Sequence, residues 1–286
     1  MQVEVALTDG TDLKAFRRGH PLLFGQLPSP FGHEFCGVDV GGGDRVVAAN
    51  SAPCRECAAC RRGQETLCED RPFLNGAFGE FVVVPERIAR VNMYPVPDAL
   101  AGEIAAMVEP LACCLHGVER AEVRAGATVA VLGLGPIGLM LCACVADAGA
   151  RAVAVGGRPE RRKLAPAFGA ALGDGRGADV VIEAAGTAAA WREAVELVRP
   201  GGTVVFFGGL EGGTEVPLDA QRIHYEELTL RGAFHHAPRH VRAALVFLAS
   251  GAYPWERLIT HRIGLDDLPA LFADPPRDLL KAAVYP

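Results

Sequence analysis

The stretch that decides the fold reads Ala127-Thr128-Val129-Ala130-Val131-Leu132-Gly133-Leu134-Gly135-Pro136-Ile137-Gly138. Its β-branched run at 128–132 predicts a buried parallel strand, and the apolar residues from 137 to 148 predict a helix closed by Gly149. The glycines between them are spaced G-x-G-x-x-G, which permits a tight turn and brings a pyrophosphate close to the helix. Against the alternative of a glycine-rich turn without a ligand, we expect dinucleotide binding by Gly133, Gly135, Pro136, Ile137 and Gly138.

The next predicted strand, at 151–155, indicates which dinucleotide is bound. In NAD-binding turns an acidic residue at the end of this strand accepts the ribose 2′-hydroxyl, but here the strand runs into Gly156, Gly157 and Arg158. The glycines leave room, and a guanidinium offers a planar fork for a 2′-phosphate. We therefore expect these residues and Arg161 to select NADP, with NAD as the alternative. The competing interpretation for Arg161 and Arg162 is the solvated face of the following helix.

The chain beyond this point continues to alternate strands and helices. Strands are expected at 179–185 and 203–207, with a helix at 188–198 between them, which predicts a doubly wound parallel sheet of the α/β class. Only ten residues separate Phe168 from Asp179, and that is too few for both a strand and a crossover helix. One βα unit is therefore expected to be deleted or vestigial.

Composition excludes several classes of partner. The 286 residues suit about two domains, and 28 basic against 34 acidic residues give a net charge of −6, with no basic excess for nucleic acid. Glycines interrupt the apolar stretch at 125–146, so a membrane span is not expected. The amino end has no basic segment before an apolar run, so no secretory signal is expected and the protein should be cytoplasmic.

Four of the nine cysteines have metal-ligand spacing, C-x2-C-x2-C-x7-C. Four thiolates fit tetrahedral zinc and leave no open position, so the loop at 54–68 predicts a structural zinc site. An iron–sulfur cluster is the rival, but its bacterial motif places the fourth cysteine after three residues and before a proline. Unliganded thiols on such a charged loop would be liable to oxidation. The expected ligands are Cys54, Cys57, Cys60 and Cys68.

Three further stretches complete a resemblance to a known family: Asp9-Gly10-Thr11-Asp12, Gly32-His33-Glu34 and Glu109-Pro110-Leu111. With the cysteine loop and the glycine turn, they make the chain resemble the zinc-dependent medium-chain dehydrogenases, in the sorbitol, threonine and glucose dehydrogenase-like branch. The resemblance implies a mostly β, GroES-like catalytic domain at 1–112 and 255–286 and a Rossmann-type dinucleotide-binding domain at 113–254. It also implies a trimmed form, because relatives carry more residues before the Asp9 position.

The resemblance assigns a catalytic zinc to Asp9, His33, Glu34 and Glu109. The family's usual cysteine ligand is replaced here by Asp9, and zinc accepts a carboxylate oxygen in that role. Cys36 is a lower-ranked substitute for the missing thiolate. The competing interpretation is that this part of the chain binds no catalytic metal.

The activity implied by the resemblance is hydride transfer between an alcohol, polyol or sugar-like substrate and NADP(H). A zinc with an open position acidifies the alcohol, and the nicotinamide accepts the hydride. Thr11 corresponds to the family's proton-relay hydroxyl and Lys14 is a candidate to continue the path, with a helix cap as the alternative role of Thr11. The resemblance further implies a homodimer or homotetramer.

Two other functions fit the same motifs. A catalytically silent relative would bind a dinucleotide and keep only the zinc of the cysteine loop. A zinc-independent quinone or enoyl reductase of the same fold is disfavoured, because such relatives typically lack both the cysteine loop and the His-Glu pair.

Overall fold

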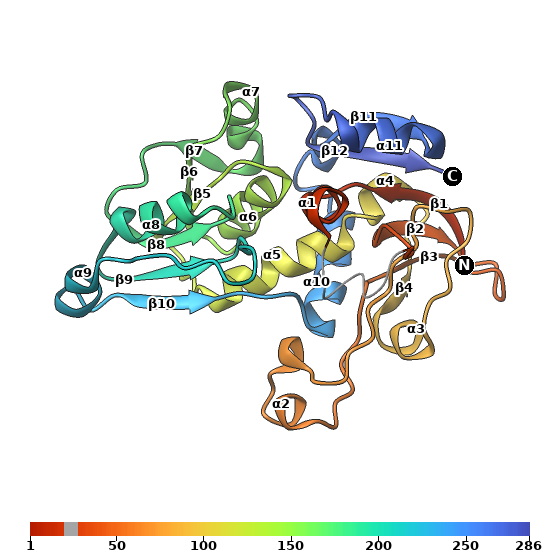
Figure 1. Ribbon diagram of the computed structural model, residues 1–286, viewed down its shortest axis with the longest axis horizontal. Coiled ribbons are helices and arrows are strands. Elements are labelled where there is room, and N and C mark those ends of the chain that lie inside the picture. The colour runs from red at the N-terminus through yellow and green to blue at the C-terminus, as the bar shows by residue number, and fades with distance from the viewer. Residues whose placement is uncertain (20–27) are drawn as a thin grey trace. The chain divides into compact units, whose positions relative to one another are not determined.

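The computed structural model describes residues 1–19 and 28–286, and the chain divides into two compact units (Figure 1). Unit 1 comprises Met1–Ala112 and His236–Pro286, and unit 2 comprises Cys113–His235. The stretch 236–254, which the sequence analysis placed in the dinucleotide-binding domain, therefore belongs to unit 1. Its helix α10 (Pro238–Ala249) packs on α3 (Glu86–Asn92) and α4 (Gly102–Ala105), both in unit 1.

Unit 2 is built on a sheet of six parallel strands, which confirms the predicted α/β class and doubly wound topology. The strand order is β7-β6-β5-β8-β9-β10, so the order reverses between β5 and β8. In such sheets ligands bind beyond the carboxyl ends of the strands at the point of reversal. The strands are β5 (Thr128–Leu132), β6 (Arg151–Val155), β7 (Ala170–Leu172), β8 (Ala178–Glu183), β9 (Val198–Phe206) and β10 (Thr229–Gly232).

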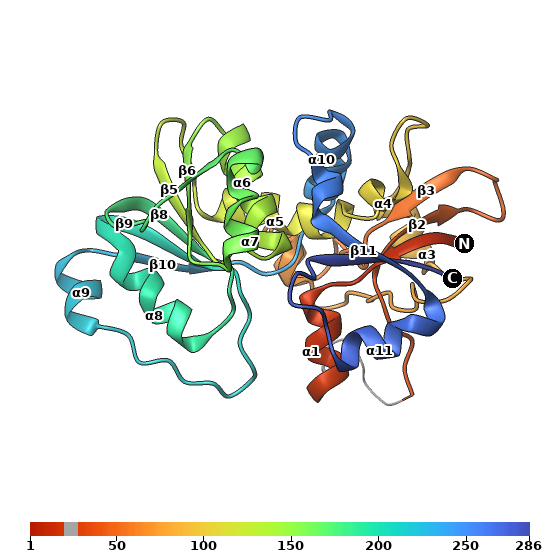
Figure 2. The ribbon, with the colours of Figure 1, turned by 90° about the horizontal axis from the view of Figure 1, so that it is seen from above.

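Helices cover both faces of this sheet (Figure 2). Because successive strand residues point to opposite faces, Ala130 packs in the core cluster beside α8 (Ala188–Leu197), whereas Val131 lies under Gly138 of α6 (Pro136–Asp147). The shorter helices are α7 (Pro159–Arg162), η2 (Ala165–Phe168) and α9 (Ala220–Tyr225). The longest helix in the part of the chain that the structure describes, α5 (Val108–Arg120), has 13 residues, and no helix there meets the requirements of a membrane span.

A short glycine-rich connection replaces the crossover helix between β7 and β8. Residues 173–177, all described, form no helix, in agreement with the residue count that predicted a vestigial βα unit. The segment lies against the sheet itself: a Cβ at Gly175 would come 2.6 Å from Val155 Cγ2 and 2.9 Å from Ala130 Cβ. The backbone can come this close to the sheet only because residue 175 has no side chain. A short glycine-containing segment therefore covers this part of the sheet where a helix would otherwise lie.

We expect Gly175→Ala to lower the free energy of unfolding by about 2–3 kcal/mol, measured by urea denaturation. The new methyl group would meet buried side chains, and the backbone φ of +71° disfavours any residue but glycine. Gly177→Ala is the matched control, because its φ is +73° but nothing lies within 4 Å of a Cβ there. The control should lose only about 1 kcal/mol from backbone strain. Equal losses in the two variants would contradict the close approach to the sheet.

Unit 1 contains the second six-stranded sheet, in the order β11-β12-β1-β2-β3-β4. Its neighbouring strands are antiparallel except for the parallel pair β11 and β12. This agrees with the mostly β, GroES-like expectation. The strands are β1 (Gln2–Leu7), β2 (Glu34–Val38), β3 (Arg45–Ala48), β4 (Met93–Pro95), β11 (Ile259–Gly264) and β12 (Lys281–Tyr285).

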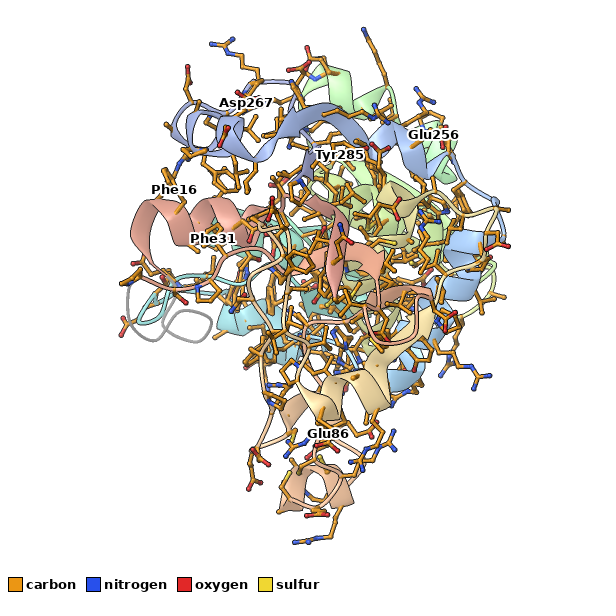
Figure 3. All side chains as sticks on the ribbon, turned by 90° about the vertical axis from the view of Figure 1, so that its right-hand side faces the viewer. Phe16, Phe31, Glu86, Glu256, Asp267 and Tyr285 are labelled. Carbon is orange, nitrogen blue, oxygen red and sulfur yellow. The ribbon has the colours of Figure 1, made fainter. Side chains whose placement is uncertain are left out.

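A cluster of four aromatic rings holds the segment that leads into His33. Phe16 of α1 (Gly10–Arg18) and Phe31 both contact Phe272 of α11 (Leu268–Ala273), with ring centroids 5.6 and 5.9 Å apart, and Figure 3 shows Phe16 and Phe31 on the same side of this unit. Phe78 completes the cluster at 6.0 Å from Phe31. Gly32, with φ at +85°, makes the turn after Phe31, because a Cβ there would meet the Phe78 ring at 2.7 Å.

Candidate active site

Three strand ends meet in unit 1 and bring distant residues together. Leu7, the last residue of β1, is paired with Glu34 on one side and with Ala283 of β12 on the other. The chain leaves β1 into Thr8 and Asp9, while β12 starts at Lys281. The register of the sheet therefore brings Asp9, the pair His33-Glu34 and Lys281 close together.

His33 lies between two carboxylates at the start of α1. Its Nε2 is 3.8 Å from Asp9 Oδ2, and its Nδ1 is 3.4 Å from Asp12 Oδ1. His33 and Asp12 are buried, while the side chain of Asp9 is 18% exposed. A carboxylate facing one ring nitrogen orients the imidazole so that the other nitrogen can bind a metal. Asp12 was not among the predicted site residues, although its spacing from Asp9 was the available signal.

Asp9 also begins helix α1. Its Oδ1 accepts the amide of Asp12 at 2.6 Å, and Asp12 Oδ2 accepts the amide of Asp9 at 3.1 Å, a reciprocal capping box. The alternative role of Thr11 as the helix cap is therefore wrong. The Thr11 side chain instead hydrogen-bonds the Asp9 carboxylate. Lys14 lies three residues later on the same helix, so the two belong to the same face, and their relay role stays a prediction.

Two groups of potential metal ligands share His33. The ligand atoms of His33, Glu34 and Glu109 lie within 4.8 Å of one another, and so do those of Asp9, Asp12 and His33. Within the described residues, Glu34 Oε1 is buried without a hydrogen-bond partner, whereas His33 Nδ1 and Asp12 Oδ1 face each other. Buried polar atoms are normally bonded, and nitrogen with carboxylate oxygens is a donor set that zinc accepts. The residues present therefore fit a metal ion.

Lys281 is a site residue that the sequence analysis missed. Its Nζ lies 2.5 Å from Glu34 Oε2 and 3.2 Å from the main-chain oxygen of Thr8, and both charged side chains are 1% exposed. The pair leaves Glu34 Oε1 as the unbonded oxygen. A lysine that starts an otherwise apolar strand was the only signal in the sequence, since a charge rarely enters such a position unpaired.

Burial governs the titration of the acidic groups. It raises the pKa of Glu34 to about 8, although the charge of Lys281 opposes the shift. Burial, reinforced by the charge of Asp9, also raises the pKa of Asp12 to about 6. Burial lowers the pKa of His33, but the carboxylates of Asp9 and Asp12 outweigh it, so the net shift is well above the ordinary value. These groups perturb one another strongly, as is typical of functional sites.

Glu109 is held from its other side by a buried histidine. Nε2 of His236 is 3.7 Å from Glu109 Oε1 and 3.2 Å from Asn50 Oδ1. All three residues are buried, with exposures of 3–6%. Such contacts restrict the rotamer of Glu109 and keep its carboxylate directed at one place.

Cys36 does not belong to either group of potential ligands. It is fully buried on β2, and burial raises the pKa of its thiol to about 12. The charged residues that affect its pKa are Arg45 and Glu4. They form a bidentate ion pair, in which Nε and Nη2 of Arg45 donate to the two carboxylate oxygens of Glu4. A thiol with so high a pKa is a poor source of the thiolate that zinc binds, so the structure does not support Cys36 as the substitute ligand.

The four cysteines of the loop converge. Their sulfurs all lie within 4.8 Å of one another, and Cys54 Sγ is 3.9 Å from Cys60 Sγ, close to the ~3.8 Å edge of a tetrahedral zinc–sulfur site. Main-chain amides point at the sulfurs, including those of Cys57 and Glu69. The amides of Glu69 and Cys60 lower the pKa of Cys57 to about 6, which favours the thiolate. In Figure 1 this loop, with α2 (Ala58–Arg61) and η1 (Glu65–Leu67), extends away from the unit 1 sheet.

We expect Cys60→Ala to remove one zinc ion per chain and to lower Tm by about 5–10 °C, because the free energy of binding a structural zinc ion adds to the stability of the fold. Metal analysis by mass spectrometry and a thermal melt measure the two effects. Cys142→Ala, a buried thiol of α6, is the control that should leave the zinc content unchanged. Full zinc content in Cys60→Ala would contradict the site, and iron with acid-labile sulfide in the wild type would favour the cluster alternative.

The glycine turn of unit 2 has the form expected for a dinucleotide site. Gly133 has φ at +104°, and Gly138 packs so tightly on the Gly133 carbonyl that a Cβ would overlap it. Gly135 is the N-cap of α6, which Pro136 begins, and no side chain caps this helix. Its first amides are therefore available to an anion, and Ile137 continues the first turn.

The residues that follow β6 present two arginines beside this turn. Gly156 and Gly157 both have positive φ, at +72° and +78°, and both are exposed together with Arg158. Arg161 is half-buried, with Nη1 4.0 Å from the position of a Cβ on Gly135. Burial, and then the charge of Arg158, lower the pKa of Arg161. Arg162 instead donates to the main-chain oxygen of Gly156, at 3.3 Å.

Comparison with known families yields two matches in separate parts of the chain. Residues 1–98 match the alcohol dehydrogenase GroES-like domain, and residues 170–250 match the model described as zinc-binding dehydrogenase.

Individual proteins show the same relationship over most of the chain. Sorbitol dehydrogenase of Bacillus subtilis (strain 168) is 31% identical, over 85% of this chain and 74% of its own length. L-galactonate-5-dehydrogenase of Escherichia coli (strain K12) is 32% identical, over 88% of this chain and 80% of its own. A solved structure from Sinorhizobium meliloti 1021, described as a zinc-binding dehydrogenase bound to NADP, is 33% identical with a TM-score of 0.90, covering 100% of this chain and 91% of that one.

Proposed function

We propose that this chain, which belongs to the zinc-dependent medium-chain dehydrogenase family, transfers hydride between a polyol or sugar-like alcohol and NADP(H). The observation that carries the proposal is the buried group of His33, Glu34 and Glu109, whose ligand atoms converge within 4.8 Å. Polyol and sugar-acid dehydrogenases among the relatives support the substrate class, and the NADP-bound relative supports the cofactor. We assign catalysis to unit 1 and dinucleotide binding to unit 2.

The residues of unit 1 have distinct roles in this proposal. Asp9, His33, Glu34 and Glu109 hold the catalytic zinc, and Cys54, Cys57, Cys60 and Cys68 hold the structural one. When bound, the catalytic zinc makes an alcohol oxygen more acidic, and the nicotinamide accepts the hydride.

The neighbouring groups keep these ligands in place. Asp12 faces His33 Nδ1 and orients the ring, while Lys281 fixes Glu34 through one oxygen and leaves the other available. In this proposal the hydroxyl of Thr11, which hydrogen-bonds Asp9, passes the substrate proton on and Lys14 continues the path.

The substrate class is tested by a turnover screen of the zinc-loaded protein with polyols, sugars and simple alcohols, each with NADP and with NAD. We expect the highest kcat/KM with a polyol or sugar-like alcohol and NADP. Turnover of quinones without turnover of any alcohol or aldehyde would overturn the proposal.

Cofactor selection is expected to depend on Arg158. Arg158→Ala should reduce the ratio of kcat/KM for NADP over NAD about 10- to 100-fold, since a charge-assisted contact to a 2′-phosphate contributes about 1.5–3 kcal/mol. Arg162→Ala is the matched control, because that guanidinium is bonded to the Gly156 carbonyl. An unchanged ratio in Arg158→Ala, or a wild type that prefers NAD, would contradict the assignment.

The catalytically silent alternative draws support from Asp9, which stands where the family resemblance leads one to expect a cysteine. Metal analysis separates the two functions. We expect about two zinc ions per chain, whereas the silent alternative requires only the ion in the cysteine loop.

A further inference from the structure

Glu183 is a buried acidic residue at the place in unit 2 where the strand order reverses. It is the last residue of β8, has no exposed surface, and is paired in register with Leu132, the last residue of β5. Ligands of doubly wound sheets bind beyond these strand ends. The proposed function uses the glycine turn and the arginines here but gives Glu183 no role.

Glu183 forms hydrogen bonds with two loops, the one after β8 and the one after β9. Its side-chain Oε1 accepts the amides of Ala185 and Gly186, each at 2.7 Å. Its main-chain oxygen accepts the amides of Phe207 and Gly208, at 3.0 and 2.9 Å, from the segment that follows β9. The turn after β8 and the turn after β9 are therefore fixed by the same residue.

The turn at 184–186, which the Glu183 carboxylate holds in place, packs directly against the glycine turn. A Cβ on Gly133 would lie 2.8 Å from the amide nitrogen of Ala185, so the two turns are in direct contact. The amide of Ala184 donates to the main-chain oxygen of Leu132 at 2.8 Å, which connects the turn at 184–186 to the end of β5. A shift of the turn at 184–186 would therefore change the space at Gly133.

We propose that Glu183 is a positioning residue for the nicotinamide dinucleotide: its carboxylate holds the turn at 184–186 against the glycine turn before the dinucleotide binds. Because the turn at 184–186 is already ordered, binding of the dinucleotide does not have to include the entropy cost of ordering it. The proposal rests on the proposed function, since it assumes that unit 2 binds a dinucleotide. Glu183 acts through the amides of Ala185 and Gly186, so its own side chain need not touch the ligand.

The test is the Kd of NADPH for the full zinc-loaded chain, from the fluorescence of the bound nicotinamide. Glu183→Asp keeps the charge but withdraws the carboxylate by one methylene, so it should raise Kd by about tenfold or more. Glu183→Gln retains an oxygen acceptor at the same reach and should stay within about threefold of the wild type. Rescue by Gln but not by Asp is a pattern that a loss of charge alone would not produce.

Asp179→Asn is the matched control, because Asp179 lies near the amino end of the same strand and also accepts a main-chain amide, that of Thr128 at 2.8 Å. It should lower Tm without changing Kd. If Glu183→Asp binds NADPH as tightly as the wild type does, or if the Asp and Gln variants have equal Kd values, the positioning role is overturned. If the wild type binds neither NADPH nor NADH, the proposed function fails instead.

Discussion

Replacing His33 with alanine is expected to lower kcat/KM for the alcohol substrate by about a thousandfold. His33 belongs to both groups of potential ligands, so its loss dismantles each of them at once. A catalytic metal contributes several kcal/mol of transition-state stabilisation, and about 4 kcal/mol corresponds to a factor of a thousand. Steady-state kinetics and the metal content measure the two consequences, and we expect one zinc ion to be lost while the ion of the cysteine loop remains.

Two further variants sharpen this test. Asp12→Asn keeps His33 itself and changes the group that faces its Nδ1, so it should reduce activity less, by about 10- to 100-fold. His261→Ala on β11 removes a histidine that is not in either group and should leave kcat/KM unchanged. Full activity in His33→Ala would show that the metal chemistry is assigned to the wrong residues.

The second large effect concerns stability. At pH 9, where the Glu34 carboxyl with its pKa of about 8 is ionised, Lys281→Met should reduce the free energy of unfolding by about 3–5 kcal/mol, because removing one partner of a buried ion pair leaves the other charge uncompensated. Glu34 is 1% exposed, and the main-chain oxygen of Thr8 would lose its donor as well. Chemical denaturation of the metal-free protein isolates this contribution from that of the zinc ion.

The double variant Lys281→Met with Glu34→Gln supplies the necessary comparison. It removes both charges, so it should recover part of the loss and show a coupling of about 2 kcal/mol or more. Lys163→Met, at an exposed position of unit 2, should change stability by less than about 0.5 kcal/mol. A Lys281→Met protein as stable as the wild type would mean that the pair contributes nothing to folding.

Local patterns predicted the elements of unit 2 well. β5 and β6 occupy the predicted ranges 128–132 and 151–155, because β-branched residues bounded by glycine leave little choice of structure. The resemblance to the family was also predicted from motifs and is confirmed by the matches.

What the sequence could not predict depends on distant contacts. Lys281 meets Glu34 across 247 positions, and His236 meets Asn50 across 186, so no window of sequence contains either pair. The second domain boundary, predicted at 254 and found at 235, was misplaced for a related reason. The apolar face of α10 is the same whichever unit it covers, and only the tertiary fold decides that it packs on α3 and α4.

The two oxygens of Asp9 have separate tasks: Oδ1 caps helix α1, and Oδ2 faces His33. In the proposed zinc site one oxygen of Asp9 therefore serves the metal and the other serves the helix, whereas a cysteine would have to do both with a single sulfur, as Cys57 does at the start of α2. A change of ligand at this position therefore also changes the start of a helix, so the metal preference of the proposed site is linked to its secondary structure.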